Sequence, residues 1–178
     1  MSAGEPNNEL WQRLAGESEN GLWNDLLLPR SKRNGQLAFS PLAAPELALG
    51  IETVYEGYLV HYGHSRLFTP GEPNLALLLG DRLYARGLVL VSELRDVAVV
   101  ADLATLLEFC ARLQAESLTG DGALWAAGIP RLGKGGIRNE SEAFLHSGDS
   151  NPLLRLAREA AGAEPVERAL AVHARLLS

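Results

Sequence analysis

The stretch Asn74-Leu-Ala-Leu-Leu-Leu-Gly-Asp-Arg-Leu-Tyr-Ala-Arg-Gly-Leu-Val-Leu-Val91 is the most informative segment of this sequence. Leucine and alanine favour helix, and Asn74 is a suitable N-cap, so we expect a helix from Asn74 to about Leu94. Its apolar residues surround nearly the whole helix instead of forming one stripe. A helix without a clear polar face is typical of a protein core, so this helix is expected to be buried.

Two further long helices are predicted beside this segment. Apolar residues recur at helical spacing from about 42 to 67 and again from about 97 to 117. Asp96 stands where the later helix needs an N-cap. Shorter helices are expected at 9–15, 152–161 and 164–177.

The segment 119–139 is rich in glycine and contains Pro130, which predicts a loop rather than a regular element. Residues 1–8 are expected to be flexible. Strand-like alternation of apolar and polar residues appears nowhere. The sequence therefore predicts one all-α domain over 1–178, a bundle of about five to seven helices.

Composition excludes several classes of protein. Of the 178 residues, 47% are hydrophobic and 21% charged, as in ordinary globular proteins rather than disordered ones. The net charge of −6 disfavours a non-specific nucleic-acid or anionic-lipid binder. A single cysteine excludes an intrachain disulfide and a cysteine-based zinc site. Because the sequence has no signal-peptide pattern and no apolar run of about 18 residues, we expect a cytoplasmic protein without a membrane span. The sequence implies no cofactor.

Three polar residues in the apolar helices are candidates for binding. His61 and His64 stand three residues apart on one predicted helix, a spacing that suits a metal, but no further ligand completes a metal site. Asp81 lies in the most apolar helix, where a buried carboxylate is costly. It is expected to pair with an Arg or His, to cap a helix irregularity, or to meet a ligand. The candidate ligand-binding residues are therefore His61, His64, Asp81, Tyr58 and Tyr84. No catalytic residue is predicted.

Two other features favour structural explanations. Gly128-Ile-Pro-Arg-Leu-Gly-Lys-Gly135 nearly matches the phosphate-binding pattern GxxxxGK[ST]. Gly135 replaces the hydroxyl that holds Mg²⁺, and no strand precedes the loop, so a nucleotide site is not expected. Cys110 occupies a core position of the 97–117 helix, which favours burial over nucleophilic attack.

Two segments, taken in order, resemble the trans-isoprenyl diphosphate synthases. Glu46-Leu-Ala-Leu-Gly-Ile-Glu-Thr-Val-Tyr-Glu-Gly-Tyr-Leu-Val-His61 is similar to the helix that ends in Leu-Ile-His before that family's first aspartate-rich motif. Asn74 to Ala85, with its Gly-Asp and Leu-x-x-Ala, is similar to the family's next helix. The resemblance covers about 42–117 and implies an isoprenoid-synthase-like helical fold that dimerises.

The departures from the family determine what the resemblance implies about function. Positions 62, 63 and 66 should hold the aspartates of DDxxD, which bind the Mg²⁺ of an allylic diphosphate, and they hold Tyr62, Gly63 and Arg66 instead. No DDxxD occurs elsewhere. The chain therefore resembles the smaller, non-catalytic subunit of two-component polyprenyl diphosphate synthases. The implied partners are a second copy or a catalytic prenyl synthase subunit, and the implied ligand is an isoprenoid.

Two alternatives stay open. One is a stand-alone helical ligand-binding domain or enzyme that uses His61, His64 and Asp81, which would need the two histidines and a carboxylate within about 4 Å. The other is a helical scaffold without a small-molecule site. A deep apolar cavity beside the 42–67 and 74–94 helices would favour the isoprenoid reading. The apolar surplus of 74–94 also predicts that some of it stays outside and mediates association.

Overall fold

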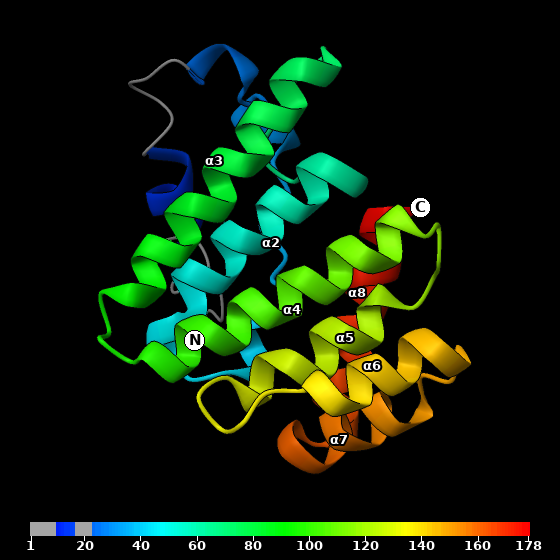
Figure 1. Cartoon of the computed structure of the whole chain (residues 1–178). Helices are drawn as coiled ribbons and strands as arrows, with labels where there is room; N and C mark the ends of the chain where they lie inside the picture. Colours follow the sequence, from blue (N-terminus) through cyan, green and yellow to red (C-terminus); the bar gives the residue numbers. More distant parts are fainter. Residues whose placement is uncertain (1–9, 17–22) are drawn as a thin grey trace.

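The computed structural model describes residues 10–16 and 23–178, and these residues form an all-α bundle (Figure 1). The prediction of the fold class is confirmed. A helix over 10–16 is followed by α2 Ala48–Tyr62, α3 Pro73–Ser92, α4 Val97–Ala115, α5 Asp121–Gly128, α6 Arg138–Ser147, α7 Asn151–Ala161 and α8 Ala163–Leu177. Short 3₁₀ turns lie at Asn24–Leu26, Arg30–Lys32, Ser40–Leu42, Pro45–Leu47 and Ile129–Arg131. Residues 1–8, expected to be flexible, lie outside the described residues.

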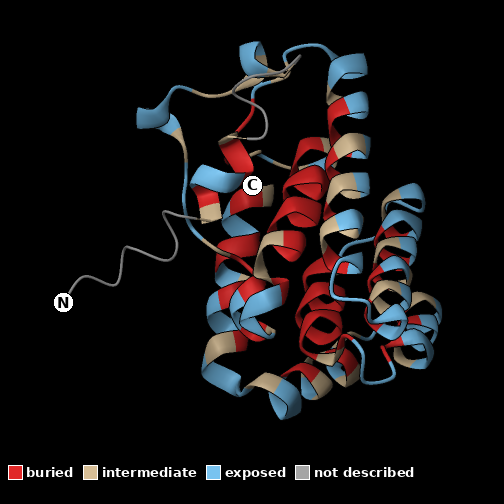
Figure 2. Cartoon of the chain, turned by 90° about the vertical axis from the view of Figure 1, so that its left-hand side faces the viewer, coloured by how far each residue is buried: buried red, intermediate tan, exposed pale blue. Residues whose placement is uncertain are grey.

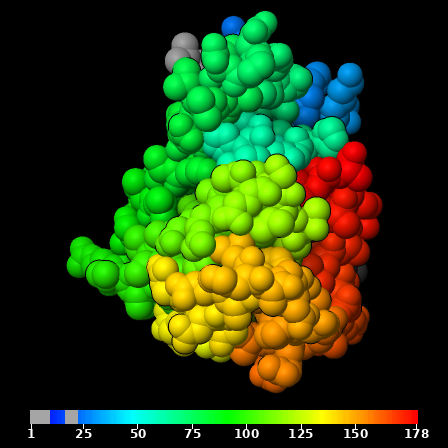
Figure 3. Space-filling model, turned by 45° about the vertical axis from the view of Figure 1, so that its right-hand side comes forward, coloured from blue at the N-terminus to red at the C-terminus, as the bar shows by residue number. Residues whose placement is uncertain are grey.

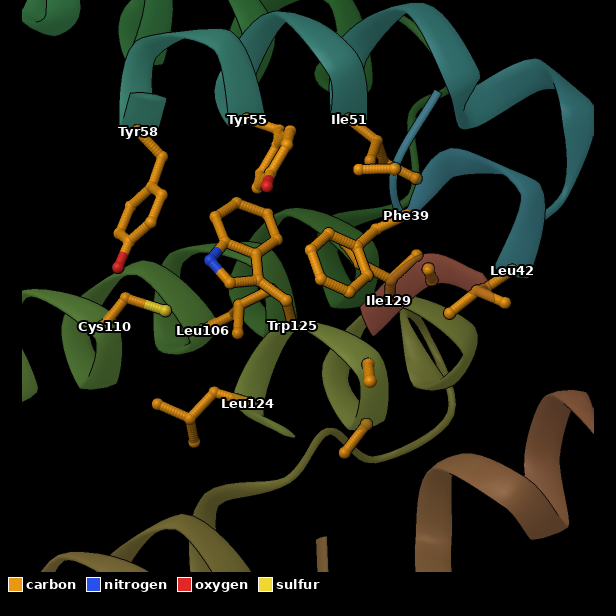
Figure 4. Packing of buried hydrophobic residues seen from close by; sticks show 14 of the residues in the cluster. Phe39, Leu42, Ile51, Tyr55, Tyr58, Leu106, Cys110, Leu124, Trp125 and Ile129 are labelled. Atoms are coloured by element: carbon orange, nitrogen blue, oxygen red, sulfur yellow. The ribbon is translucent and has the colours of Figure 1, made fainter. Parts of the chain in front are cut away.

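Helix α2 forms the centre of the bundle, and every residue from Gly50 to Val60 is buried. Below it lies α5, whose Trp125 packs against two tyrosines of α2 (Figure 4). The ring centroids of Trp125 and Tyr55 are 5.1 Å apart, and those of Trp125 and Tyr58 are 5.4 Å apart. Cys110 of α4 is buried in the same core, as its helical position predicted. The apolar core therefore joins α2, α4 and α5.

Helix α3 packs against α2 along one side only. Its buried residues share one face, and most of the others are exposed or intermediate (Figure 2). The expectation of a buried helix holds for one face of α3 only, because α2 is its principal neighbour and covers a single face. The residues buried on that face are Leu79, Gly80, Leu83, Gly87 and Val91. In the part of the chain that the structure describes, no helix is both long and apolar enough to cross a bilayer.

The glycine-rich segment 119–139 contains a buried helix, so the prediction of a loop there is wrong. Gly120, with φ 107°, precedes α5, and two glycines within α5 allow close packing. A Cβ at Gly122 would lie 2.8 Å from the ring of His173, and one at Gly128 would lie 3.2 Å from Leu106. Glycine was needed here for space between helices. An irregular turn follows α5, and three of its glycines have positive φ: Gly133, Gly135 and Gly136.

The ends of the other helices mostly follow their local signals. The Asp96 carboxylate accepts hydrogen bonds from the amides of Ala98 and Val99, at 2.9 and 3.3 Å, so the predicted N-cap of α4 is confirmed. Helix α3 begins at Pro73, so Asn74 is not its cap. Helices α7 and α8 begin and end within a residue of their predicted bounds. The total exceeds the expected five to seven helices because α5 and α6 occupy or follow the expected loop.

Candidate functional site

Helix α2 ends between the two candidate histidines. The Gly63 amide donates to the Leu59 carbonyl at 2.9 Å, and the next amide, that of His64, donates to Leu176 of α8 at 2.7 Å. The chain therefore turns away from the α2 axis before His64. The expectation that His61 and His64 share one helix face is wrong, because the helix is shorter than the 42–67 pattern predicted.

His61 lies in the last turn of α2 and contacts α3. Its Nε2 is 3.3 Å from Oδ1 of Asp81. Gly80 makes room for the imidazole, since a Cβ at that position would lie 2.3 Å from the same nitrogen. Burial lowers the pKa of His61, and the charge of Asp81 opposes that shift only in part. His61 is therefore largely neutral at pH 7 and able to act as a hydrogen-bond donor or acceptor.

Asp81 pairs with a histidine, as one of its predicted roles required, but it is not buried. Its side chain is 66% exposed, whereas that of His61 is 10% exposed. The expected burial is wrong because Asp81 lies at the edge of the α2–α3 interface: its carboxylate reaches His61, but the rest of its side chain faces outward. An ion pair in which the carboxylate is mostly exposed adds little stability, even though the histidine is largely buried.

Aromatic rings surround His61. The ring of Tyr84 has its centroid 5.2 Å from that of His61, and the ring of Tyr62 lies 5.5 Å away. Tyr58 follows, 5.0 Å from Tyr62. Burial raises the pKa of all three phenols, so they stay neutral across the physiological range. We call these four residues and Asp81 the His61 cluster.

The structure thus brings together four of the five predicted site residues and leaves one out. His61, Asp81, Tyr58 and Tyr84 belong to the cluster, while His64 lines a separate hollow. That hollow has a volume of about 300 Å³ and is lined by Leu28, Leu59, Val60, Gly63, His64, Ser65, Phe68, Thr69 and Pro70. Sequence reasoning missed Tyr62 as a cluster member, although its place next to His61 at the helix end was visible.

Tyr58 also belongs to a buried polar network that joins α2 to α5 and α8. Its hydroxyl donates to Oδ2 of Asp121 at 2.5 Å, and Nε2 of His173 lies 3.1 Å from the same oxygen. Tyr55 contacts Nδ1 of His173 at 2.8 Å, and Gln114 donates to the Tyr58 hydroxyl at 2.7 Å. Burial alone would raise the pKa of Asp121, but His173 and the Tyr58 hydroxyl outweigh it and lower the pKa. Sequence reasoning missed this network because each of its contacts joins two residues that are more than fifty positions apart.

A second buried network is centred on Arg66, which is 1% exposed. Its Nε donates to Glu56 at 2.8 Å and its Nη1 donates to Glu52 at 2.7 Å, and both carboxylates belong to α2. The guanidinium also lies 4.4 Å above the ring of Trp11. Burial lowers the pKa of Arg66, but the two carboxylates outweigh this effect and raise it. Arg66 is therefore a charged structural residue that fastens the 63–68 loop to α2.

In the loop that nearly matches the phosphate-binding pattern, polar groups make hydrogen bonds to other groups of the protein. The Gly133 amide donates to the Asp102 carboxylate at 2.9 Å. Lys134 Nζ donates to the Pro130 carbonyl at 3.2 Å, and Arg131 Nε to the Gly136 carbonyl at 2.9 Å. Helix α5 precedes the loop where the motif requires a strand. Among the described residues, no group of three or more His, Cys, Asp or Glu side chains is placed to hold a metal ion.

Comparison with known proteins finds no matching family model, no matching curated protein and no matching solved structure. Evidence about function therefore comes from the surfaces and side-chain clusters of the chain itself.

Proposed function

We propose that this chain is a non-catalytic relative of the polyprenyl diphosphate synthases that acts by association with protein. The observation that carries the proposal is the apolar surface that α3 leaves exposed. Leu78 is 58% exposed and Val89 is 49% exposed, although both lie on a helix of the main bundle. Contiguous apolar surface of this kind usually marks an interaction site.

Several exposed residues of α3 lie along one side of the helix. Leu78, Ala85 and Val89 are exposed, and the partly buried Arg82 lies between the first two; spacings of three and four place all four residues on one side of the helix. We call this side the outer face of α3. Figure 3 shows α3 as a ridge along the edge of the molecule, with α2 visible only as a band between α3 and α4. Exposed apolar residues continue beyond the end of α3: Leu94 in the α3–α4 turn is 42% exposed, and Val97, the first residue of α4, is 82% exposed.

The positions where the resemblance implies Mg²⁺-binding aspartates support a non-catalytic role. Tyr62 belongs to the aromatic His61 cluster, and Gly63 ends α2. Arg66 holds Glu52 and Glu56 inside the core. A cation committed to a buried ion pair supplies no ligand for Mg²⁺, which requires oxygen donors.

An isoprenoid ligand and a role in shaping a hydrocarbon cavity stay predictions. The 300 Å³ hollow lies beside the 63–70 loop, and α3 contributes no residue to it. The alternative of a site built from His61, His64 and Asp81 required three groups to converge. Two of them meet, at 3.3 Å, and His64 lies elsewhere.

Association and its surface are tested together. The purified chain is measured by light scattering alone and after mixing with a catalytic prenyl synthase subunit from the same organism. The first measurement detects self-association, and the second detects a complex with the synthase subunit. We expect a complex that Leu78→Glu abolishes. Leu118→Glu is the matched control, because Leu118 is 41% exposed but lies beyond the end of α4. A wild-type chain that stays monomeric and does not bind the synthase subunit would contradict the proposal.

A further inference from the structure

The negative charge of Asp81 has no arginine or lysine partner within the described part of the chain. Its ion-pair contact there is with His61, at 3.3 Å, and burial lowers the pKa of that imidazole, so the pair carries little positive charge at pH 7. The two arginines of α3 contact other groups. Arg82 lies 5.8 Å from the centre of an indole ring, and Arg86 lies 4.0 Å from a different carboxylate. The carboxylate of Asp81, whose side chain is 66% exposed, is therefore available to a cation from outside the chain.

Two tyrosine rings lie beside this carboxylate. The rings of Tyr62 and Tyr84 flank His61, and their planes are inclined to the imidazole by 41° and 44°, so neither ring is stacked flat on it. Burial is the main cause of the raised pKa of both phenols, and the charge of Asp81 adds to it in both, so the carboxylate lies near both rings. Tyr62 is 42% exposed and Tyr84 is partly exposed. Among the described residues, no arginine or lysine lies over either ring.

We propose that Tyr62, Asp81 and Tyr84 bind the guanidinium group of an arginine side chain that another protein presents. The carboxylate supplies the opposite charge and the hydrogen-bond acceptors, and the tyrosines supply ring faces that attract a cation. This inference rests on the proposed association with protein and names a chemical group that the partner carries. The side of α3 that holds Asp81 and Tyr84 lies about a quarter of a turn from the outer face of α3, so the site is separate from the apolar surface that carries that proposal.

The core of this protein holds a guanidinium group in a similar chemical setting. Arg66 lies 4.4 Å from the centre of the Trp11 ring and 5.1 Å from that of Tyr55. Its nitrogens donate to the carboxylates of Glu52 and Glu56. The His61 cluster presents the same two kinds of group, aromatic rings and a carboxylate, at the surface. A guanidinium group suits this combination better than an ammonium group, because it is flat enough to stack on a ring while its N–H groups point sideways to an acceptor.

The surroundings of the site favour an arginine of a protein over a free compound. Leu77 is 55% exposed and lies four residues before Asp81, while Tyr84 lies three residues after it, so all three share one side of α3. Solvent screens an exposed carboxylate and exposed rings, so these groups alone hold a cation weakly. Apolar contact with Leu77 adds binding that a protein segment obtains and a small cation does not. Arginine and tyrosine are also enriched in protein interfaces.

Two small probes test the chemistry of the site. N-acetylarginine amide and N-acetylcitrulline amide have nearly the same shape, but only the first carries a positive charge. An NMR titration of the ring protons of His61 and Tyr62, at about pH 8 where histidine is neutral, should give a dissociation constant of about 1–10 mM for the arginine probe. The citrulline probe should bind at least about fivefold more weakly. Equal binding of the two probes, or no binding of either, would overturn the guanidinium site.

Variants locate the bound probe on the surface. Asp81→Asn should weaken binding of the arginine probe about fivefold, and Tyr62→Leu should weaken it about threefold. Glu159→Gln is the matched control, because Glu159 is an exposed carboxylate on α7 and its loss should leave binding unchanged. Both test positions are exposed, so the variants should fold. Binding that is as strong in Asp81→Asn as in the wild type would overturn the assignment of the site.

A peptide probe tests whether the arginine belongs to a protein. A helical peptide with a leucine four residues from its arginine should bind at least about fivefold more tightly than N-acetylarginine amide, and Leu77→Gln should remove this gain. Equal affinities of the peptide and the single amino acid would overturn the protein source. The probes need no partner protein, so this test is separate from the association test. If Leu78→Glu abolishes a complex seen by light scattering but the arginine probe does not bind, the proposed function stands and only this inference fails.

Discussion

Gly57 of α2 and Gly80 of α3 approach so closely that a Cβ added to Gly57 would lie 2.9 Å from the Gly80 carbonyl oxygen. One heptad away along both helices, a Cβ at Gly87 would lie 2.8 Å from the Gly50 carbonyl oxygen. The two helices therefore cross with their backbones in contact. The absence of a side chain at Gly80 also leaves room for the His61 ring to reach Asp81.

Gly57→Ala should lower the free energy of unfolding by about 1–3 kcal/mol, because the new methyl group meets backbone atoms that cannot move independently of α3. Urea denaturation measures the loss. Gly16→Ala is the control, since a Cβ at Gly16 has no neighbour within 4 Å. Equal stability of Gly57→Ala and wild type would show that α2 and α3 are not in backbone contact.

Arg66→Met should destabilise the fold by about 3–5 kcal/mol, because it leaves the carboxylates of Glu52 and Glu56 buried without a counter-charge. The loss is measured by thermal and urea unfolding. Arg168→Met removes an exposed ion pair with Glu164 and should cost less than about 1 kcal/mol. Similar losses for the two variants would contradict the buried network.

Asp121→Asn should reduce stability at pH 7 by about 1–2 kcal/mol, because the neutral amide loses a charged acceptor that binds Tyr58 and His173. The folded protein holds the pKa of Asp121 below its ordinary value of 3.8. The ionised carboxylate therefore stabilises the fold above about pH 4, and this contribution is lost as the pH falls through the folded pKa. Urea unfolding from pH 7 to 3 should show the gap between wild type and variant closing below about pH 4. The exposed Asp25→Asn should show no such gap at any pH.

Asp81→Asn should leave stability unchanged within about 1 kcal/mol, because the Asp81 carboxylate is mostly exposed. It should nevertheless lower the pKa of His61 further, since the carboxylate charge is what raises it against the effect of burial. An NMR titration of the His61 ring protons measures the shift, with the other histidines as internal controls. A rise in the His61 pKa would contradict the contact between the two side chains.

The purified chain should form no product from allylic and homoallylic diphosphates in the presence of Mg²⁺. The resemblance to the trans-isoprenyl diphosphate synthases implies aspartates at positions 62, 63 and 66, but the chain has Tyr62, Gly63 and Arg66 there. Ionisation of the diphosphate needs metal ions that such aspartates would hold. Product formation is measured by chromatography of the extracted lipids. Turnover that disappears when residues of this chain are substituted would contradict the expectation and the non-catalytic proposal with it.

Local pattern was enough to predict the helices whose signals lie close together in the sequence. The apolar spacing indicated the long helices α2 to α4, and the Asp96 side chain capped α4 as its chemistry required. The spacing also placed Cys110 in the core. The surplus of apolar residues in 74–94 indicated that some of them stay outside. Such features depend on neighbours within a helical turn or two, which a sequence displays directly.

Contacts between distant residues determined the rest. The apolar count favoured α3 as the buried helix, whereas the structure buries α2, because Arg66 and backbone amides satisfy Glu52 and Glu56. Asp121 stays charged inside the protein because His173, 52 residues later, lies beside it. Helix α5 forms in a glycine-rich segment because its neighbours need the space that a side chain would fill. Burial and pairing depend on which elements meet, and periodicity within one element carries no information about its partner.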